Sequence, residues 1–105
     1  MPVEPYEIVF DTEIESHLTA IDLKYHNLIR RVIAEQLRLQ AEVETRNRKK
    51  LREPAAFGAT WEIRFGPDNR FRVLYRVEPG RRAVVLAIGI KQNNRLRIGE
   101  QEIQL

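Results

Sequence analysis

Two neighbouring segments of this chain carry arginines at positions where their charges could act together. Residues 61–65 and 71–77 alternate apolar and polar side chains as half-buried β-strands do, and residues 66–69 (Gly-Pro-Asp-Asn) form a turn sequence between them. In the resulting hairpin, Arg64 lies directly opposite Arg72. Like charges facing each other destabilise a sheet, so this pairing predicts either a cationic surface for a polyanion or arginines that decorate a solvated face.

The register of this hairpin follows from its apolar residues. The alignment that opposes the two arginines also brings three apolar pairs together on the other face: Phe65 with Phe71, Ile63 with Val73, and Trp61 with Tyr75. Glu62 is then the carboxylate on the arginine side and lies diagonal to Arg72 and Arg76, where it offsets part of the repulsion. Trp61 and Tyr75 are expected in the core rather than as platforms for stacking bases.

A second basic group precedes the hairpin. Residues 45–52 (Thr-Arg-Asn-Arg-Lys-Lys-Leu-Arg) are either a solvated loop or part of a track for phosphates. The residues that we expect to bind RNA along such a track are Arg46, Arg48, Lys49, Lys50, Arg52, Arg70, Arg76 and Arg95.

Length and composition limit the classes of protein. A chain of 105 residues makes one domain, residues 1–105, with a small core. It has no cysteine, no signal peptide and no apolar run that could span a membrane, so we expect a cytoplasmic protein without disulfides. The net charge is +3, but six acids and no Lys or Arg precede Lys24, so the remainder carries 18 bases against nine acids. This asymmetry indicates a surface with one cationic side.

The periodicity predicts the order β-α-α-β-β-β. We expect a strand over 6–10, a short helix begun by a capping box of Thr12 and Glu15, and a long helix over about 22–45 with Leu39 and Val43 on its apolar stripe. The hairpin is followed by a buried strand over 83–90, and residues 98–105 form a last strand or a tail. The fold class is α+β, with an antiparallel-rich sheet of about four strands packed against a helical hairpin and a polar opposite face.

The chain resembles a known protein family in several of its segments. The element order, the basic segment that ends in Lys50-Leu51-Arg52, the stretch from Arg64 to Tyr75 and the ending Lys91 to Leu96 are similar to the RelE/ParE superfamily of bacterial toxins from type II toxin–antitoxin systems. The resemblance covers nearly the whole chain. Its nuclease members enter the ribosomal decoding site and cut mRNA by attack of the ribose 2′-hydroxyl on the phosphate.

The resemblance implies roles for particular residues. By position, Arg72 matches the family's phosphate-stabilising arginine, Arg64 matches a basic residue of the preceding strand, and Lys91 lies at the basic end of the last core strand. The candidate catalytic residues are therefore Arg72, Arg64, Lys91 and Glu62. Glu62 is a candidate base for the 2′-hydroxyl, and Lys91 or Lys50 is the alternative. No Tyr or His follows Lys91, where many nuclease members place one, and no metal or other cofactor is implied.

Three functions stay open from the sequence. The first is a ribosome-dependent mRNA endoribonuclease that inhibits translation. The second is a ParE-like inhibitor of DNA gyrase without nuclease activity, and the third is a degenerate, non-toxic member. All three imply a cognate antitoxin protein as partner. The two histidines, His17 and His26, are expected to be structural.

Overall fold

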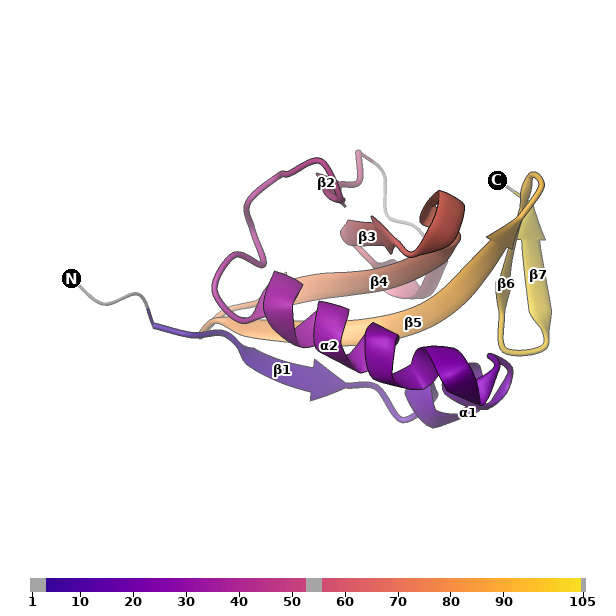
Figure 1. Ribbon diagram of the computed structural model, residues 1–105. Coiled ribbons are helices and arrows are strands. Elements are labelled where there is room, and N and C mark those ends of the chain that lie inside the picture. Colours follow the sequence, from indigo (N-terminus) through magenta and orange to yellow (C-terminus); the bar gives the residue numbers. More distant parts are fainter. Residues whose placement is uncertain (1–3, 53–55, 105) are drawn as a thin grey trace.

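The computed structural model describes residues 4–52 and 56–104. Two helices and a single sheet make up these parts of the chain (Figure 1). The elements are β1 (Glu7–Phe10), α1 (Ile14–Thr19), α2 (His26–Leu37), β2 (Arg48–Lys50), β3 (Trp61–Phe65), β4 (Phe71–Glu78), β5 (Arg82–Gln92), β6 (Arg95–Ile98) and β7 (Gln101–Gln104). Short 3₁₀ turns lie at Leu23–Tyr25, Ala56–Gly58 and Pro67–Asn69.

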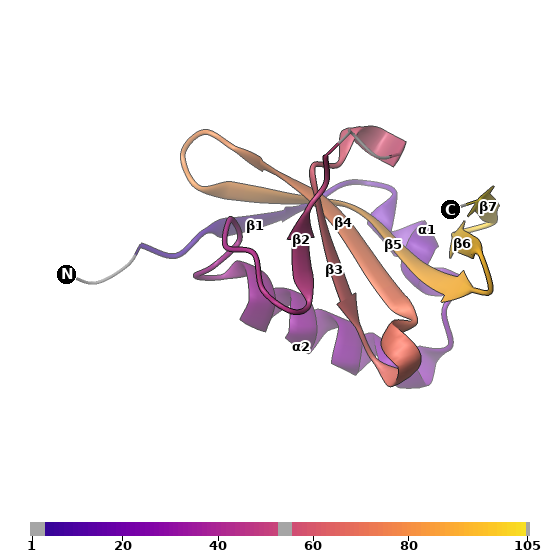
Figure 2. The same ribbon diagram turned by 90° about the horizontal axis from the view of Figure 1, so that it is seen from above.

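The sheet is larger than the sequence predicted. The α+β class and the packing of two helices against an antiparallel-rich sheet are confirmed, but the described residues form seven strands rather than about four. Six of them follow the order β2-β3-β4-β5-β6-β7, and β1 pairs in parallel with the first half of β5 (Figure 2). The extra strands come from the basic segment, which forms β2 instead of a loop, and from the C-terminal residues, which form a second hairpin.

The central hairpin has the predicted register. Phe65 pairs with Phe71, and Arg64 pairs with Arg72, with the two remaining apolar pairs also as expected. The predicted pairing is therefore confirmed. The apolar residues specify it, because a shift of one residue would have moved every apolar side chain to the opposite face.

The main core lies between the sheet and α2. Ile29, Ile33 and Leu37 of α2 are fully or almost fully buried, and they pack against the apolar side of β3, β4 and β5. The helix is shorter than predicted: it ends at Leu37, and Leu39 and Val43 are half exposed. The predicted capping box is also wrong, because α1 begins at Ile14 and Asp11 Oδ1 instead accepts a bond from the Glu13 amide.

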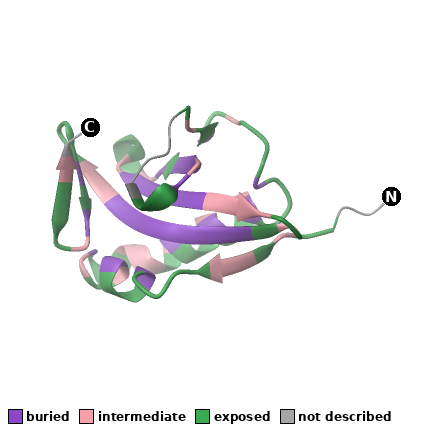
Figure 3. Ribbon diagram, turned by 180° about the vertical axis from the view of Figure 1, so that it is seen from behind, coloured by how far each residue is buried: buried purple, intermediate pink, exposed green. Residues whose placement is uncertain are grey.

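We had expected the opposite face of the sheet to be polar, but part of it is apolar. A second apolar cluster lies there, composed of Ala59, Leu74, Val84, Leu86, Ala87, Leu96 and Ile98. A register shift between Leu74 and Tyr75 leaves Leu86 as an extra residue in β5. Because both sides of β5 are covered, its residues 83–89 are all buried, as the apolar run predicted (Figure 3).

The β6–β7 hairpin stands at the far end of the sheet (Figure 1). Gly89 pairs with Ile98, and β6 approaches it so closely that a β-carbon on Gly89 would lie 2.7 Å from the Arg97 carbonyl oxygen. Glycine at position 89 therefore allows the hairpin to bring Leu96 and Ile98 onto the second apolar cluster.

His17 forms a hydrogen bond with the part of the β5 edge that lies between its partner strands β1 and β6. β1 pairs with residues 82–85 of β5 and β6 with residues 89–92, and the buried His17 ring accepts a bond from the Ile88 amide at 3.3 Å through Nδ1. The same ring stacks edge-on against Phe57, with centroids 5.9 Å apart. Its position agrees with the structural role that the sequence favoured.

Candidate nucleic-acid interface

A single carboxylate joins the two opposed arginines. Glu62 Oε1 accepts a bond from Arg64 Nε at 2.6 Å and a longer one from Arg72 Nη1 at 3.4 Å. The Glu62 and Arg72 side chains are only 9% and 6% exposed, whereas the Arg64 side chain is 48% exposed. The repulsion that the sequence predicted is therefore offset inside the protein, and two positive charges share one negative charge.

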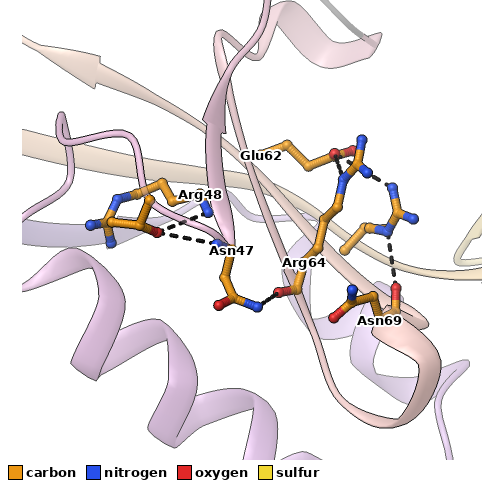
Figure 4. A network of polar contacts seen from close by, with 7 residues as sticks. Asn47, Arg48, Glu62, Arg64 and Asn69 are labelled. Atoms are coloured by element: carbon orange, nitrogen blue, oxygen red, sulfur yellow. Dashed lines mark hydrogen bonds and ion pairs between the residues drawn. The ribbon is translucent and has the colours of Figure 1, made fainter.

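Hydrogen bonds to backbone groups hold the strands that carry the trio of Glu62, Arg64 and Arg72. Arg72 Nε donates to the Asn69 carbonyl oxygen at 3.2 Å, so the turn before β4 holds that guanidinium from a second side. The Asn47 side-chain amide donates to the Arg64 backbone carbonyl at 2.9 Å (Figure 4), and the Asn47 backbone carbonyl accepts from the Arg64 backbone amide at 2.8 Å. The Arg72 guanidinium is therefore held by two partners, whereas the contacts with Asn47 hold the backbone of Arg64 and leave its guanidinium bonded to Glu62 alone among the described residues.

Burial and the Glu62 carboxylate shift the pKa of Arg72 in opposite directions. Burial lowers the pKa of Arg72, and the Arg64 charge lowers it further, while the Glu62 carboxylate and its hydrogen bond raise the pKa. Arginine has so high a pKa that it stays protonated in this setting. The trio therefore keeps a net positive charge at neutral pH.

More bases extend the same side of the sheet. Lys49 pairs with Glu62 in the register, and Lys91 pairs with Leu96, so alternation of side chains places both on the side of Arg64 and Arg72. Lys91 and Arg70 line a surface pocket of about 340 Å³ with Asp68. Within the described residues, no acid lies at ion-pair distance from Lys49, Arg70 or Lys91.

Arg48 has to be removed from the predicted RNA-binding set. Its side chain is fully buried on the helix side of the sheet, where it donates to the Gln36 carbonyl at 2.6 Å, to Gln36 Oε1 at 2.7 Å and to the Val43 carbonyl at 2.5 Å. Figure 4 shows it pointing towards α2, away from Glu62 and Arg64. Arg48 thus fastens the end of α2 to β2 and cannot reach a phosphate.

The remaining predicted residues are spread over the surface. Arg76 is separated from Arg72 by the buried Leu74 and pairs with Glu78 at 2.8 Å, and Arg95 pairs with Glu102 at 3.1 Å. Lys50, on the opposite side of β2 from Lys49, is exposed, which separates this alternative base from Arg72. Arg46 and Arg52 are also exposed, before and after β2.

Within residues 4–52 and 56–104, no group of three or more His, Asp or Glu side chains is placed to hold a metal ion. In the same parts of the chain, no helix is long and apolar enough to cross a membrane.

Comparison with known proteins shows the family to which the chain belongs. A family model described as "Phage derived protein Gp49-like (DUF891)" matches residues 22–105. The chain belongs to the Gp49-like family. This Gp49-like protein is also similar to a chain of the crystal structure of the RelBE2 toxin–antitoxin complex from Mycobacterium tuberculosis, with a TM-score of 0.67 and 21% sequence identity. The match covers 86% of this chain and 95% of that one, and it confirms the predicted RelE/ParE-like fold. No curated protein matches the chain.

Two features of the Gp49-like protein were missed by sequence reasoning. Glu62 contacts Arg64 and Arg72, although its diagonal position had suggested Arg72 and Arg76 as its neighbours. Arg48 is buried although it lies in a run of exposed bases. The pairing of β2 with β3 could have revealed the burial of Arg48, because Arg48 lies opposite the apolar Ile63.

Proposed function

We propose that this Gp49-like protein is the toxin of a toxin–antitoxin pair and that it cleaves mRNA on the ribosome. The observation that carries the proposal is the pair of arginines from adjacent strands, Arg64 and Arg72, on one side of a RelE-like sheet. Arginine suits phosphate because its planar, permanently charged fork can donate two parallel bonds to one anion.

RNA cleavage by the 2′-hydroxyl requires three events at the site. The 2′-hydroxyl of one nucleotide loses its proton and attacks the adjacent phosphorus, the bond to the 5′-oxygen of the next nucleotide breaks, and that oxygen takes a proton. Arg72 and Arg64 stabilise the charge that develops on the phosphate oxygens, and each such contact is worth on the order of a hundredfold in rate. The products are a 2′,3′-cyclic phosphate and a 5′-hydroxyl.

Glu62 is the best-placed base in the described residues. It is the carboxylate in contact with both arginines, and it becomes free to accept the 2′-hydroxyl proton when Arg64 turns to the phosphate. Lys91 shares this side of the sheet and has no acid partner among the described residues, so it is the candidate donor to the leaving oxygen.

One observation favours a second function. The described histidines and tyrosines are engaged elsewhere: the three tyrosines pack in the helix-side core, His17 is buried at the edge of β5, and the His26 ring bonds the Ile21 carbonyl. A site without these groups fits a ParE-like inhibitor of DNA gyrase, which needs a binding surface and no hydrolytic group. A degenerate, non-toxic protein is the third outcome, seen as expression tolerated without an antitoxin.

The proposal implies a cognate antitoxin. The RelBE2 structure is that of a toxin–antitoxin complex, which supports a small protein partner for this chain as well. An acidic or amphipathic segment would complement the basic side of the sheet. Affinity capture from native cells should recover a small protein, and recovery of none would argue against this pairing.

A pair of purified systems separates the two functions. We expect the protein to stop translation in a cell-free extract that contains ribosomes and to leave gyrase activity on supercoiled plasmid unchanged. Stalled gyrase with normal translation would replace the nuclease proposal with the second function, and no effect in either system would favour the third.

A further inference from the structure

Glu62 lies where an anion bound by both arginines would lie. A single oxygen of this carboxylate accepts bonds from Arg64 and Arg72, which come from neighbouring strands. Carboxylate and phosphate are recognised by guanidinium groups with the same fork geometry and comparable charge. The resting protein therefore carries an internal anion on the surface that is proposed to receive RNA.

We propose that Glu62 acts as an internal competitor for the RNA phosphate and that binding of RNA takes Arg64 away from it. This inference rests on the proposed function, because it concerns how the same side of the sheet meets RNA. Glu62 thereby becomes a specificity residue: it weakens contact with isolated phosphates and favours RNA that offers further contacts.

The two arginines differ in how easily they can move. The Arg72 side chain is almost fully buried and bonds both the Asn69 carbonyl and Glu62. The Arg64 side chain is half exposed, and its Nε bond to Glu62 is the one side-chain bond found for its guanidinium among the described residues. Arg64 can turn outward by breaking this one bond, and the loss of that bond is the cost that RNA binding must offset, whereas Arg72 stays and forms the fixed half of the phosphate site.

The balance of charge gives the inference a measurable consequence. Two arginines and one carboxylate leave one net positive charge, and neutralising the carboxylate would leave two. Glu62→Gln keeps the shape of the side chain and an oxygen acceptor for the arginines while it removes the negative charge. RNA should then bind more tightly, with more counterions released on binding.

The chain offers a matched control. Glu78 also pairs with an arginine of β4, Arg76, at 2.8 Å, and the alternation of β4 places it on the same side of the sheet. Leu74 separates that pair from Arg72, so Glu78→Gln changes the net charge by the same amount away from the proposed phosphate site.

The test measures the affinity of a short fluorescent single-stranded RNA for the full chain over a range of salt concentrations. Glu62→Gln should tighten binding by about tenfold at low salt. The slope of log affinity against log salt should become steeper by roughly 0.7. Glu78→Gln should change affinity by no more than about twofold, because screening weakens distant charges.

Each outcome decides the inference. Unchanged or weaker binding by folded Glu62→Gln, with RNA binding by the wild type, would overturn it and leave the proposed function standing. Equal tightening by both variants would also overturn it, since net charge alone would then explain the effect. No RNA binding by wild type and Glu62→Gln alike would remove the inference and the proposed RNA binding together, whereas RNA binding by the variant alone would support the inference.

A measurement on the wild type covers the case in which Glu62→Gln fails to fold. The Nε–H signals of the arginines can be followed by NMR while the same RNA is added. The Arg64 signal should shift strongly as its bond to Glu62 breaks, and the Arg72 signal should shift less. An Arg64 signal that is unchanged at saturating RNA would overturn the inference.

Discussion

Arg48 and Arg72 are both buried, on opposite sides of one sheet, and the groups that hold them differ. Arg48 bonds only neutral oxygens at the end of α2 and in the turn that follows, whereas Arg72 bonds a carboxylate that it shares with a half-exposed second arginine. The backbone oxygens among them, those of Gln36 and Val43, cannot leave without local unfolding of the helix end and the turn after it. A carboxylate shared between two cations can be exchanged for another anion, so the comparison separates a structural arginine from a functional one.

The largest effect that we expect on stability is at Arg48. Arg48→Ala leaves a cavity and several unpaired oxygens in the core, so the free energy of unfolding should fall by about 3–5 kcal/mol. Urea denaturation measures this loss. Arg46→Ala, at an exposed base two residues away, is the control and should stay within about 0.5 kcal/mol of wild type. Similar small losses in both would show that Arg48 is not the structural member of the comparison.

Arg72→Ala should mainly affect function. Loss of one phosphate contact is expected to reduce cleavage by about a hundredfold, which should relieve growth arrest on expression. Arg76→Ala removes a base from the same side of the same strand but outside the trio, so it should reduce toxicity much less than Arg72→Ala does. Growth curves of cells that express each variant, with circular dichroism to confirm folding, measure the difference. Undiminished toxicity of Arg72→Ala would place the functional surface elsewhere.

A steric change beside Arg72 tests how closely the second hairpin must approach. Gly89 pairs with Arg72, and Gly89→Ala would push a β-carbon to 2.7 Å from a backbone oxygen of β6. Such overpacking should cost about 1–3 kcal/mol in the free energy of unfolding. Thermal melting measures the loss. A melting temperature equal to that of wild type would mean that the β6–β7 hairpin can move away from the sheet without penalty.

The smallest predicted effect concerns pH and His17, which resembles Arg48 in being held by the backbone. Burial lowers the pKa of His17, although Glu13 and Asp11 oppose this shift. The unfolded chain therefore binds a proton more readily than the folded protein, so stability should fall as the pH drops through the ordinary histidine value of 6.5. Urea midpoints between neutral and mildly acidic pH should show this fall, and His17→Gln should flatten it. An equal fall in the variant would assign the effect to other groups.

The parts of the fold that the sequence predicted are those in which one period dominates. The alternation of residues 61–65 and 71–77 determined the register of the hairpin and therefore the pairing of Arg64 with Arg72. The apolar run at 83–90 likewise predicted a strand covered on both faces. In the hairpin the apolar side chains all fall on one face, and in the run at 83–90 they occupy both faces, so the burial of each segment followed from its own sequence.

The parts that were missed depend on contacts between distant segments. The apolar stripe of α2 seemed to continue through Leu39 and Val43, but the helix ends at Leu37, and Arg48, from a different element, bonds the carbonyls at that end. The second apolar cluster depends on a β-bulge and on the close approach of β6 at Gly89, and neither has a signal in local periodicity. The shared position of Glu62 between two arginines requires the actual side-chain directions.

Primer extension on mRNA from cells that express the wild type or Arg72→Ala tests the central proposal most directly. The account predicts new 5′ ends within translated regions for the wild type and their absence for the folded Arg72→Ala variant. Growth arrest by the wild type without new mRNA ends, or the same ends from both proteins, would contradict it.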